Sequence, residues 1–600
     1  MLIPRMSATE RMAIAAPANG LLLYDTDSTA FGYYNGSNWL FLKRSMDTSY
    51  DWNTRGNAGT NPGTDFIGTT DNNPLYFRVD NLPTGKIDNK NIFWGNNSGT
   101  ANTGGYSNVA IGTRALVNNT VGHNLVAVGD SALFNQVLSA DYNNTAVGSK
   151  TLFANTTGWF NTAIGSNALF ANTTASGNTA VGYETLLLNT TGANNTAAGN
   201  RALRANIAGS NNTAFGSATL YENTTGNHNS AIGYQALLYN KTGTGNTATG
   251  YTAMYYNSTG NYNSTFGMQA LSYNTTGSYN SAAGYSTLLF NVSGSNNSAL
   301  GSYSMLSNMN GNSNVAIGAF TLANNRINSN LVAIGDSSLL NSGHYQGVDY
   351  SVAGNTALGS KALYTDYNGS YNTAIGSLAA YTGTGSSNTA LGHQAQYNTT
   401  GNFNTLIGKS AFITGTFNNW TAIGYNTGAG YSASNSVELG NSSVSLVRGQ
   451  VNYSTFSDRR IKDNIEENVP GLRFISLLKP VTYNLNIHRQ NQLMYGKEKP
   501  DTVNWEGKYD IEKIKMTGFI AQDVEAAANQ VGYNFSAIQK PVNDKGLYSI
   551  SYAEFTVPLV KAVQEQQVQI EELKTANNNL QKQLERLIKI IEALKQAGSK

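Results

Sequence analysis

Side chains that could do chemistry are concentrated in one short segment, residues 457–465, which reads SDRRIKDNI. The segment combines a serine with a lysine, and a serine hydroxyl attacks a carbonyl once a nearby base removes its proton. A lysine amine is such a base only when burial or neighbouring cations disfavour its protonated form. The two arginines of the segment act in that direction on Lys462, whereas its two aspartates oppose it. A serine and a lysine this close in the sequence could therefore act as nucleophile and base.

Other chemical sites are not expected. The five histidines are far apart and share no ligand spacing, so neither a metal nor a cofactor is predicted; they are His123, His228, His344, His393 and His488. The chain has no cysteine, which excludes disulfides and thiolate ligands. The few acidic residues before residue 450 form no carboxylate pair of the glycosidase type, so a polysaccharide-cleaving spike is not supported.

The chain that surrounds the candidate segment changes character near residue 452. Charged residues make up 12% of the chain against a usual quarter, with 62 glycines and 35 tyrosines. Lys/Arg and Asp/Glu number nine and eight between residues 101 and 450, but twenty and eighteen between 454 and 600. A net charge of +2 without a basic cluster indicates no nucleic-acid partner. No apolar stretch reaches signal-peptide or membrane-span length, so the export signal is missing or the protein leaves on an assembled particle.

The part before residue 452 is a repeat. The motif Asn-Thr-Ala-apolar-Gly recurs every seventeen residues in eleven copies, from Asn144 to Asn314, and less regular copies on both sides bring the total to about nineteen. With that asparagine as position one, position five is always glycine, position nine leucine or methionine, and position twelve asparagine. The regular intervals predict one structural unit for each copy.

Each unit has too few apolar residues to fold alone, so stability must come from stacking. The apolar residues at positions three and four, and at eight and nine, predict two very short strands joined by Gly and Asn turns. Coils stacked at the spacing of parallel strands, about 4.8 Å, would place equivalent asparagines above one another in amide ladders. We therefore expect a mainly β protein with a parallel β-roll or solenoid shaft, in which the repeated Asn, Gly and Leu are scaffold.

A longer duplication overlies the repeat, because SNVAIGTRAL and NLVAVGDSAL near residue 107 match SNVAIGAFTL and NLVAIGDSSL near residue 313. Each pair is followed by an insertion that contains Asp-Tyr, at Asp141 and Tyr142 and at Asp349 and Tyr350. Insertions into an otherwise constant coil should leave the column as loops.

The repeats resemble the YadA-like head repeats of trimeric bacterial adhesins, which share the NTAxG…AL…N signature. The resemblance implies a left-handed β-roll in a homotrimer, with a shaft over residues 104–450. Tyrosines at repeat spacing, such as Tyr234, Tyr239, Tyr251, Tyr255 and Tyr256, could bind sugars, although covering the core or the trimer seam is the favoured interpretation.

Residues 1–45 predict a compact N-terminal attachment module. A helix over residues 7–16 would precede strands at residues 21–25 and 31–41, with an Asn-Gly hairpin at Asn35 and Gly36. The sequence PRMSATERMAIAAPANGLLLYDTD resembles a module at the start of bacterial surface and fibre-like proteins, and residues 46–103 resemble the connector that precedes their repeats.

The last forty residues, 561–600, predict a coiled-coil helix. Apolar residues stand at most a and d positions of a heptad, with Asn577 at one core position that should set the register. The heptad by itself leaves dimer and trimer open, and the trimer follows from the family resemblance.

Residues 451–560 resemble the intramolecular chaperone auto-processing domain of phage tail spikes, tail fibres and endosialidases. The resemblance rests on SDRRIKDNI, LLKPVTYNL (477–485), TGFIAQDVEAA (517–527) and YSISYAEFTVPLVKAVQEQQ (548–567). In that family a serine and a lysine five residues later form a catalytic dyad, which implies Ser457 and Lys462 here. We expect Ser457 to cut the bond between Phe456 and itself, at most once for each chain. The alternative is that residues 457–465 are a charged linker into a purely structural trimerisation domain.

Together these features predict a trimeric tail fibre of a phage or contractile injection particle. The N-terminus would hold the particle baseplate or a cell envelope, and a cell-surface glycan or protein receptor would be the external partner. The alternative is a secreted bacterial adhesin, although such adhesins end in a membrane-anchor barrel. Either protein would be extracellular.

Overall fold

The computed structural model describes residues 2–42, 56, 58–61, 63–137, 142–383, 385–398, 400–412, 416–428, 434–450, 454–495, 507–541 and 546–598. They form two compact units, Met1–Phe93 and Trp94–Lys600. Asp141 of the first predicted insertion, residues 451–453 at the expected domain boundary and part of the connector lie outside the described residues.

The N-terminal module is a four-stranded sheet in the order β1-β2-β3-β4. Its elements are β1 (Arg5–Met6), α1 (Ala8–Met12), β2 (Leu22–Asp25), β3 (Ala30–Tyr34) and β4 (Trp39–Phe41). The helix is shorter than predicted, because the Ser7 and Glu10 capping box starts it and Ala13 already ends it. The predicted Asn-Gly hairpin within residues 31–41 is confirmed, since β3 and β4 pair antiparallel and the Asn35 side chain accepts from Ser37 N and Asn38 N to close the turn.

The remaining strands before the repeats are β5 (Leu75–Val79) and β6 (Leu82–Ile87), which pair antiparallel, and β7 (Asn91–Trp94) at the boundary of the two units.

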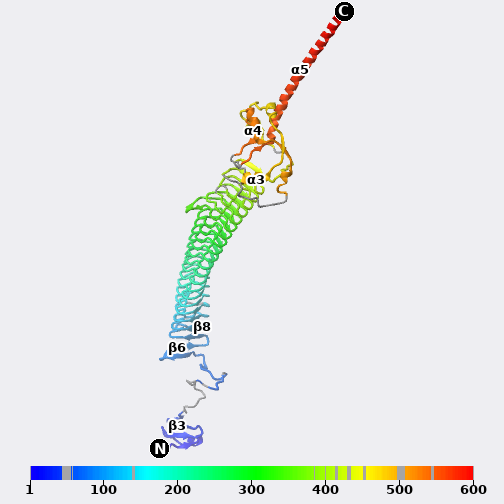
Figure 1. Cartoon of the computed structure of the whole chain (residues 1–600). Helices are drawn as coiled ribbons and strands as arrows, with labels where there is room; N and C mark the ends of the chain where they lie inside the picture. The colour runs from blue at the N-terminus through cyan, green and yellow to red at the C-terminus, as the bar shows by residue number, and fades with distance from the viewer. Residues whose placement is uncertain are drawn as a thin grey trace. The chain divides into compact units, whose positions relative to one another are not determined.

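A column of stacked coils makes up most of the second unit, running from blue at β8 to yellow-green in Figure 1. The predicted nineteen units each contribute one strand to a parallel ladder, which β29 extends by one strand. Successive strands pair without a shift, as in Ala146 opposite Ala163. The strands are β8 (Asn108–Ile111), β9 (Val126–Val128), β10 (Thr145–Val147), β11 (Thr162–Ile164), β12 (Thr179–Val181), β13 (Thr196–Ala198), β14 (Thr213–Phe215), β15 (Ser230–Ile232), β16 (Thr247–Thr249), β17 (Ser264–Phe266), β18 (Ser281–Ala283), β19 (Ser298–Leu300), β20 (Val315–Ile317), β21 (Val332–Ile334), β24 (Thr356–Leu358), β25 (Thr373–Ile375), β26 (Thr389–Leu391), β27 (Thr405–Ile407), β28 (Trp420–Ile423) and β29 (Ser436–Leu439).

The prediction of a second strand in each coil, at positions eight and nine, is wrong. Leu152 at position nine has a φ of 51° and Lys150 at position seven has a φ of 55°, both in the left-handed region that a strand excludes. The backbone still joins neighbouring coils, because Leu152 N donates to Ala168 O at 3.0 Å. Turns therefore carry the intercoil hydrogen bonds on this side, and the leucine side chain fills the core.

The asparagine ladders are confirmed by the side-chain hydrogen bonds inside the column. At position twelve, Asn172 Nδ2 donates to Asn155 Oδ1 at 2.7 Å, and at position one Asn161 Oδ1 accepts from Asn178 N at 3.0 Å. These amides are fully buried, and burying an amide without such partners costs about 1–3 kcal/mol. Asparagine is thus required at positions one and twelve by the coils above and below it.

The glycine at position five is required by close stacking. Gly165 has a φ of 130°, and a Cβ placed there would lie 2.4 Å from the carbonyl oxygen of Gly182 in the next coil. Any other side chain at this turn would separate the coils.

The second insertion leaves the column as predicted. It forms a hairpin of β22 (His344–Tyr345) and β23 (Val348–Asp349), which pair antiparallel. Asp349 anchors the hairpin to the column, because its carboxylate lies 3.2 Å from Arg326 Nη1, and within the hairpin the same carboxylate lies 2.7 Å from His344 Nδ1.

The C-terminal domain is a small α+β fold around Phe474, Val524, Ala527 and Phe535. Its elements are the 3-10 turn η1 (Arg459–Ile461), α2 (Leu472–Ile475), β30 (Val481–Tyr483), α3 (Ile487–Tyr495), η2 (Asp510–Lys513), β31 (Met516–Gly518), α4 (Ala521–Gln530), β32 (Ile538–Gln539), β33 (Ser549–Ile550), η3 (Tyr552–Phe555) and α5 (Thr556–Ala597). Within the described residues, no helix has both the length and the apolar character that a bilayer crossing needs.

Candidate functional site

The sequence around Ser457 folds into a short turn that brings the serine and the lysine together. Asp458 caps η1, because its Oδ1 accepts from Arg460 N at 2.9 Å and closes the turn over Arg459–Ile461. Extended backbone at Lys462 then turns its side chain back, and Lys462 Nζ donates to Ser457 Oγ at 2.6 Å. The two predicted catalytic side chains are thus in direct contact, as a nucleophile and its base must be.

The charges beside this contact are partly compensated. The guanidinium of Arg460 binds the Asp458 carboxylate with Nε at 3.0 Å and Nη2 at 2.5 Å, and these hydrogen bonds lower the pKa of Asp458. One of the two arginines is therefore paired with one of the two aspartates.

The surroundings of the contact are open in the single chain. Ser457, Lys462 and the residues between them are exposed, and Phe456 is 97% exposed. Water therefore surrounds the Ser457–Lys462 pair in one copy of the chain.

The segment that follows the dyad is held by the base of α5, a contact that the sequence did not reveal. Leu472 N donates to Glu565 Oε2 at 2.6 Å, across 93 residues of chain. Gly471 is required there, since a Cβ would lie 2.7 Å from Ala562 N. In the sequence, Gly471 before α2 is the one sign that another part of the chain approaches closely here. The sequence does not indicate that Glu565 is the partner.

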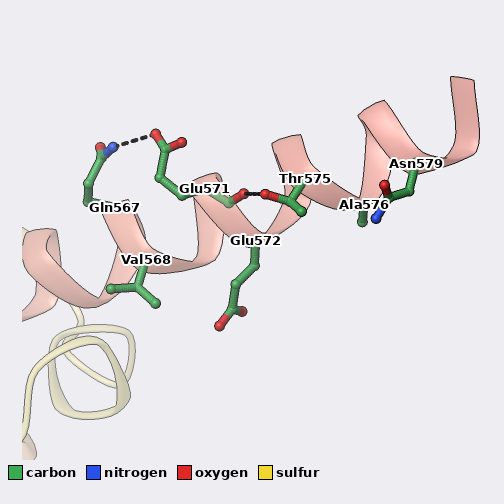
Figure 2. Close-up of a pocket in the computed structure, with 7 residues that line it drawn as sticks. All are labelled: Gln567, Val568, Glu571, Glu572, Thr575, Ala576 and Asn579. Atoms are coloured by element: carbon green, nitrogen blue, oxygen red, sulfur yellow. Dashed lines mark hydrogen bonds between the residues drawn. The ribbon is translucent and has the colours of Figure 1, made fainter. Parts of the chain in front are cut away.

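Helix α5 carries two different faces. The apolar a and d side chains of the predicted heptad are exposed along one of them; they are Val563, Ile570, Leu573, Leu580, Leu584, Leu587, Ile591 and Leu594. A shallow depression runs along positions outside a and d, lined by Gln567, Val568, Glu571, Glu572, Thr575, Ala576 and Asn579 (Figure 2). Its polar groups serve the helix itself, because Gln567 Nε2 donates to Glu571 Oε1 and Thr575 Oγ1 to Glu571 O. This depression therefore offers no converging groups for a ligand.

The column also exposes an apolar row, made by position four. Because the strands are in register, one such side chain lies above the next along most of the ladder, with Thr249 interrupting the row. Exposed members are Ile111, Ile164, Val181, Phe215, Ile232, Phe266, Leu300, Ile317, Leu358, Leu391, Ile423 and Leu439. Among the residues that the structure describes, no group of three or more His, Asp or Glu is placed to hold a metal ion.

Comparison with known families assigns both ends of the chain. A family model described as the phage tail like trimerisation region matches residues 1–56, and one described as the chaperone of endosialidase matches residues 457–533. Neither match includes the repeats, and no curated protein and no solved structure matched the chain. The chaperone match begins at Ser457, the first residue of the contact described above. These two matched regions, with a parallel β-solenoid between them in the sequence, support a trimeric protein of the phage tail fibre or spike type.

Proposed function

We propose that this protein is a trimeric tail fibre of a phage or contractile injection particle, whose C-terminal domain assembles the trimer and then cuts itself off before Ser457. The observation that carries the proposal is the contact between Lys462 Nζ and Ser457 Oγ at the first residue of the chaperone match.

Apolar surface that a single copy leaves in water supports the trimer. The position-four row runs along the column and the a and d row runs along α5, and both are buried when copies pack side by side. The trimerisation match at residues 1–56 supplies the number of copies. This match also favours a particle fibre over a secreted adhesin, and a location on a virion or elsewhere outside the cell.

The proposed reaction is an acyl shift followed by hydrolysis. Lys462 takes the proton of Ser457 Oγ, which attacks the carbonyl carbon of Phe456 and forms an ester as the bond to Ser457 N breaks. The same amine returns the proton to that leaving nitrogen. Water then hydrolyses the ester, which leaves a carboxylate on Phe456, a free hydroxyl and a new amino terminus at Ser457. The fragment of residues 457–600 separates from the shaft.

Assembly is the switch for this reaction. The Ser457–Lys462 pair is open to water in one chain, so cleavage waits until neighbouring copies cover the pair and exclude that water. Removing the assembling domain afterwards leaves the shaft with no route back to its folding pathway, which makes the trimer kinetically stable.

The test compares the masses of the purified wild type, Ser457→Ala, Lys462→Ala and Ile461→Ala. Ile461 is the matched control, because it lies in the same exposed turn and carries no charge that could act on Lys462. We expect two fragments, 1–456 and 457–600, from the wild type and the control, and a full-length chain from the other two. A full-length wild type, or cleavage in Ser457→Ala, would refute the proposed reaction.

Dependence on assembly needs a separate variant. Leu580→Lys with Leu587→Lys places charges in the a and d row of α5 while leaving the dyad unchanged. We expect this variant to be monomeric and uncut, whereas a monomer that still cleaves would show that neighbouring copies are unnecessary.

A further inference from the structure

Aromatic side chains gather on one face of four successive coils, residues 229–296. Position eleven provides a row of stacked rings, with Tyr239 and Tyr256 at 5.3 Å, Tyr256 and Tyr273 at 5.2 Å, and Tyr273 and Phe290 at 5.2 Å between centroids. Each ring comes from a different coil, so the spacing of the column sets the spacing of the rings. Tyr256 is 40% exposed and Tyr273 is 44% exposed.

A second aromatic row lies beside the first, at position six. Tyr234 and Tyr251 stack there at 5.4 Å, and both are exposed. Tyr255 connects the two rows: burial, a hydrogen bond with Tyr239 and the nearby Tyr256 and Tyr234 raise the pKa of Tyr255 to about 12. The two rows therefore form one tyrosine-rich face.

This tyrosine face differs in extent from the position-four row that supports the trimer. A seam that runs the length of a fibre must be made by a feature present in nearly every coil, and position four meets that condition from Ile111 to Leu439. The stacked rows at positions six and eleven belong to the coils of residues 229–296, and the stack of Tyr364, Tyr381 and Tyr397 farther along lies at position ten. A local feature on a long, uniform column is typical of a binding site rather than of the assembly.

The near absence of charge on this face indicates which class of partner it can bind. Residues 229–296 contain one charged side chain, Lys241. Nucleic acids and anionic membranes are held by clusters of Lys and Arg, which are absent from this stretch of sequence. Tyrosine presents an apolar ring and a hydroxyl together, which suits a partner with apolar C–H faces and many hydroxyls. A neutral sugar polymer has both.

We propose that the tyrosine face binds an extended neutral polysaccharide, laid along the fibre axis with successive sugars beside successive rings. The ring spacing is close to the length of one sugar in an extended chain, so one coil serves one sugar unit. This inference rests on the proposed fibre function and names its receptor class. Three copies in the fibre present three such faces, and simultaneous contact raises the apparent affinity without new contacts.

The experiment uses the purified full-length protein and an array of neutral and anionic polysaccharides, with peptides alongside. The test variant is Tyr256→Ala with Tyr273→Ala, because alanine occupies position eleven in other coils, such as Ala154 and Ala171. The control is Tyr262→Asn with Tyr279→Asn, another stacked and exposed pair at position seventeen of the same coils, where Asn194 and Asn211 occur elsewhere.

We expect the wild type to bind at least one neutral polysaccharide, with an affinity that changes less than twofold between low and physiological salt. The affinity of the test variant for that polysaccharide should be at least tenfold lower than the wild-type affinity, and the control variant should retain the wild-type affinity. Binding of anionic polymers or peptides alone, absence of neutral-glycan binding, or equal loss in both variants would each overturn the inference. Light scattering separates the two proposals, since a trimer that binds no sugar refutes only the ligand, whereas a monomer refutes the fibre.

Discussion

Asp366 provides the sharpest test of the column. It occupies position twelve, where the regular coils have a ladder asparagine, and its side chain is fully buried. Its Oδ2 accepts from Asn355 Nδ2 at 2.7 Å and its Oδ1 from Gly369 N at 2.8 Å. Burial raises the pKa of Asp366 to about 8 from an ordinary value of 3.8, so the folded column holds a neutral acid at pH 7.

The size of the effect follows from the two pKa values. The neutral acid favours the folded state fully below pH 3.8, and this stability is lost as pH rises toward about 8. Each pH unit between these values corresponds to about 1.4 kcal/mol, so the loss at pH 7 is at most about 4 kcal/mol. Asp366→Asn removes the titration, and the introduced amide can share the Gly369 carbonyl with Asn355, as Asn161 and Asn172 share that of Ala175.

Hydrogen exchange of the amides in residues 355–372 measures this local stability. We expect protection in the wild type to fall between pH 5 and 8 after correction for intrinsic exchange, and protection in Asp366→Asn to stay constant and exceed it at pH 8. Asn240→Asp is the reciprocal control, since it puts a carboxylate into a regular ladder and should make that coil pH-sensitive. Equal pH profiles in the wild type and Asp366→Asn would refute the reasoning.

Three further substitutions test other contacts. Gly165→Ala should prevent a soluble trimer, because its Cβ meets the Gly182 carbonyl at 2.4 Å; normal trimer yield by light scattering would contradict the stacking. Leu203→Ala leaves a cavity in the core and should lower the free energy of unfolding by about 2–5 kcal/mol. The loss should be seen as faster amide hydrogen exchange in that coil and in the neighbouring coils only. Glu565→Ala removes the acceptor of Leu472 N and should cost the C-terminal domain about 1–3 kcal/mol in thermal unfolding, with an unchanged column.

Much of the fold was predictable because the repeat forces every coil into the same environment. A residue type at position one, five or twelve must suit its copies above and below, so Asn144 and Gly148 already indicate the amide ladder and the close turn. The second strand was not predictable, because apolar alternation predicts extended backbone and leucine rarely has positive φ. Contact with the neighbouring coils holds Leu152 in that conformation.

The candidate site also has one part that the sequence predicts and one part that it does not. Ser457 and Lys462 are five residues apart, so a single capped turn is enough to bring them together and the local sequence determines their contact. The anchor of that segment is different, because Leu472 and Glu565 are 93 residues apart and meet only when α2 packs against α5. The sequence by itself determined the coil, its ladders and the dyad, since these depend on neighbours at constant short spacing. Only the tertiary structure decided which distant helix holds the dyad segment and how open the dyad is to water, because long-range packing decides both.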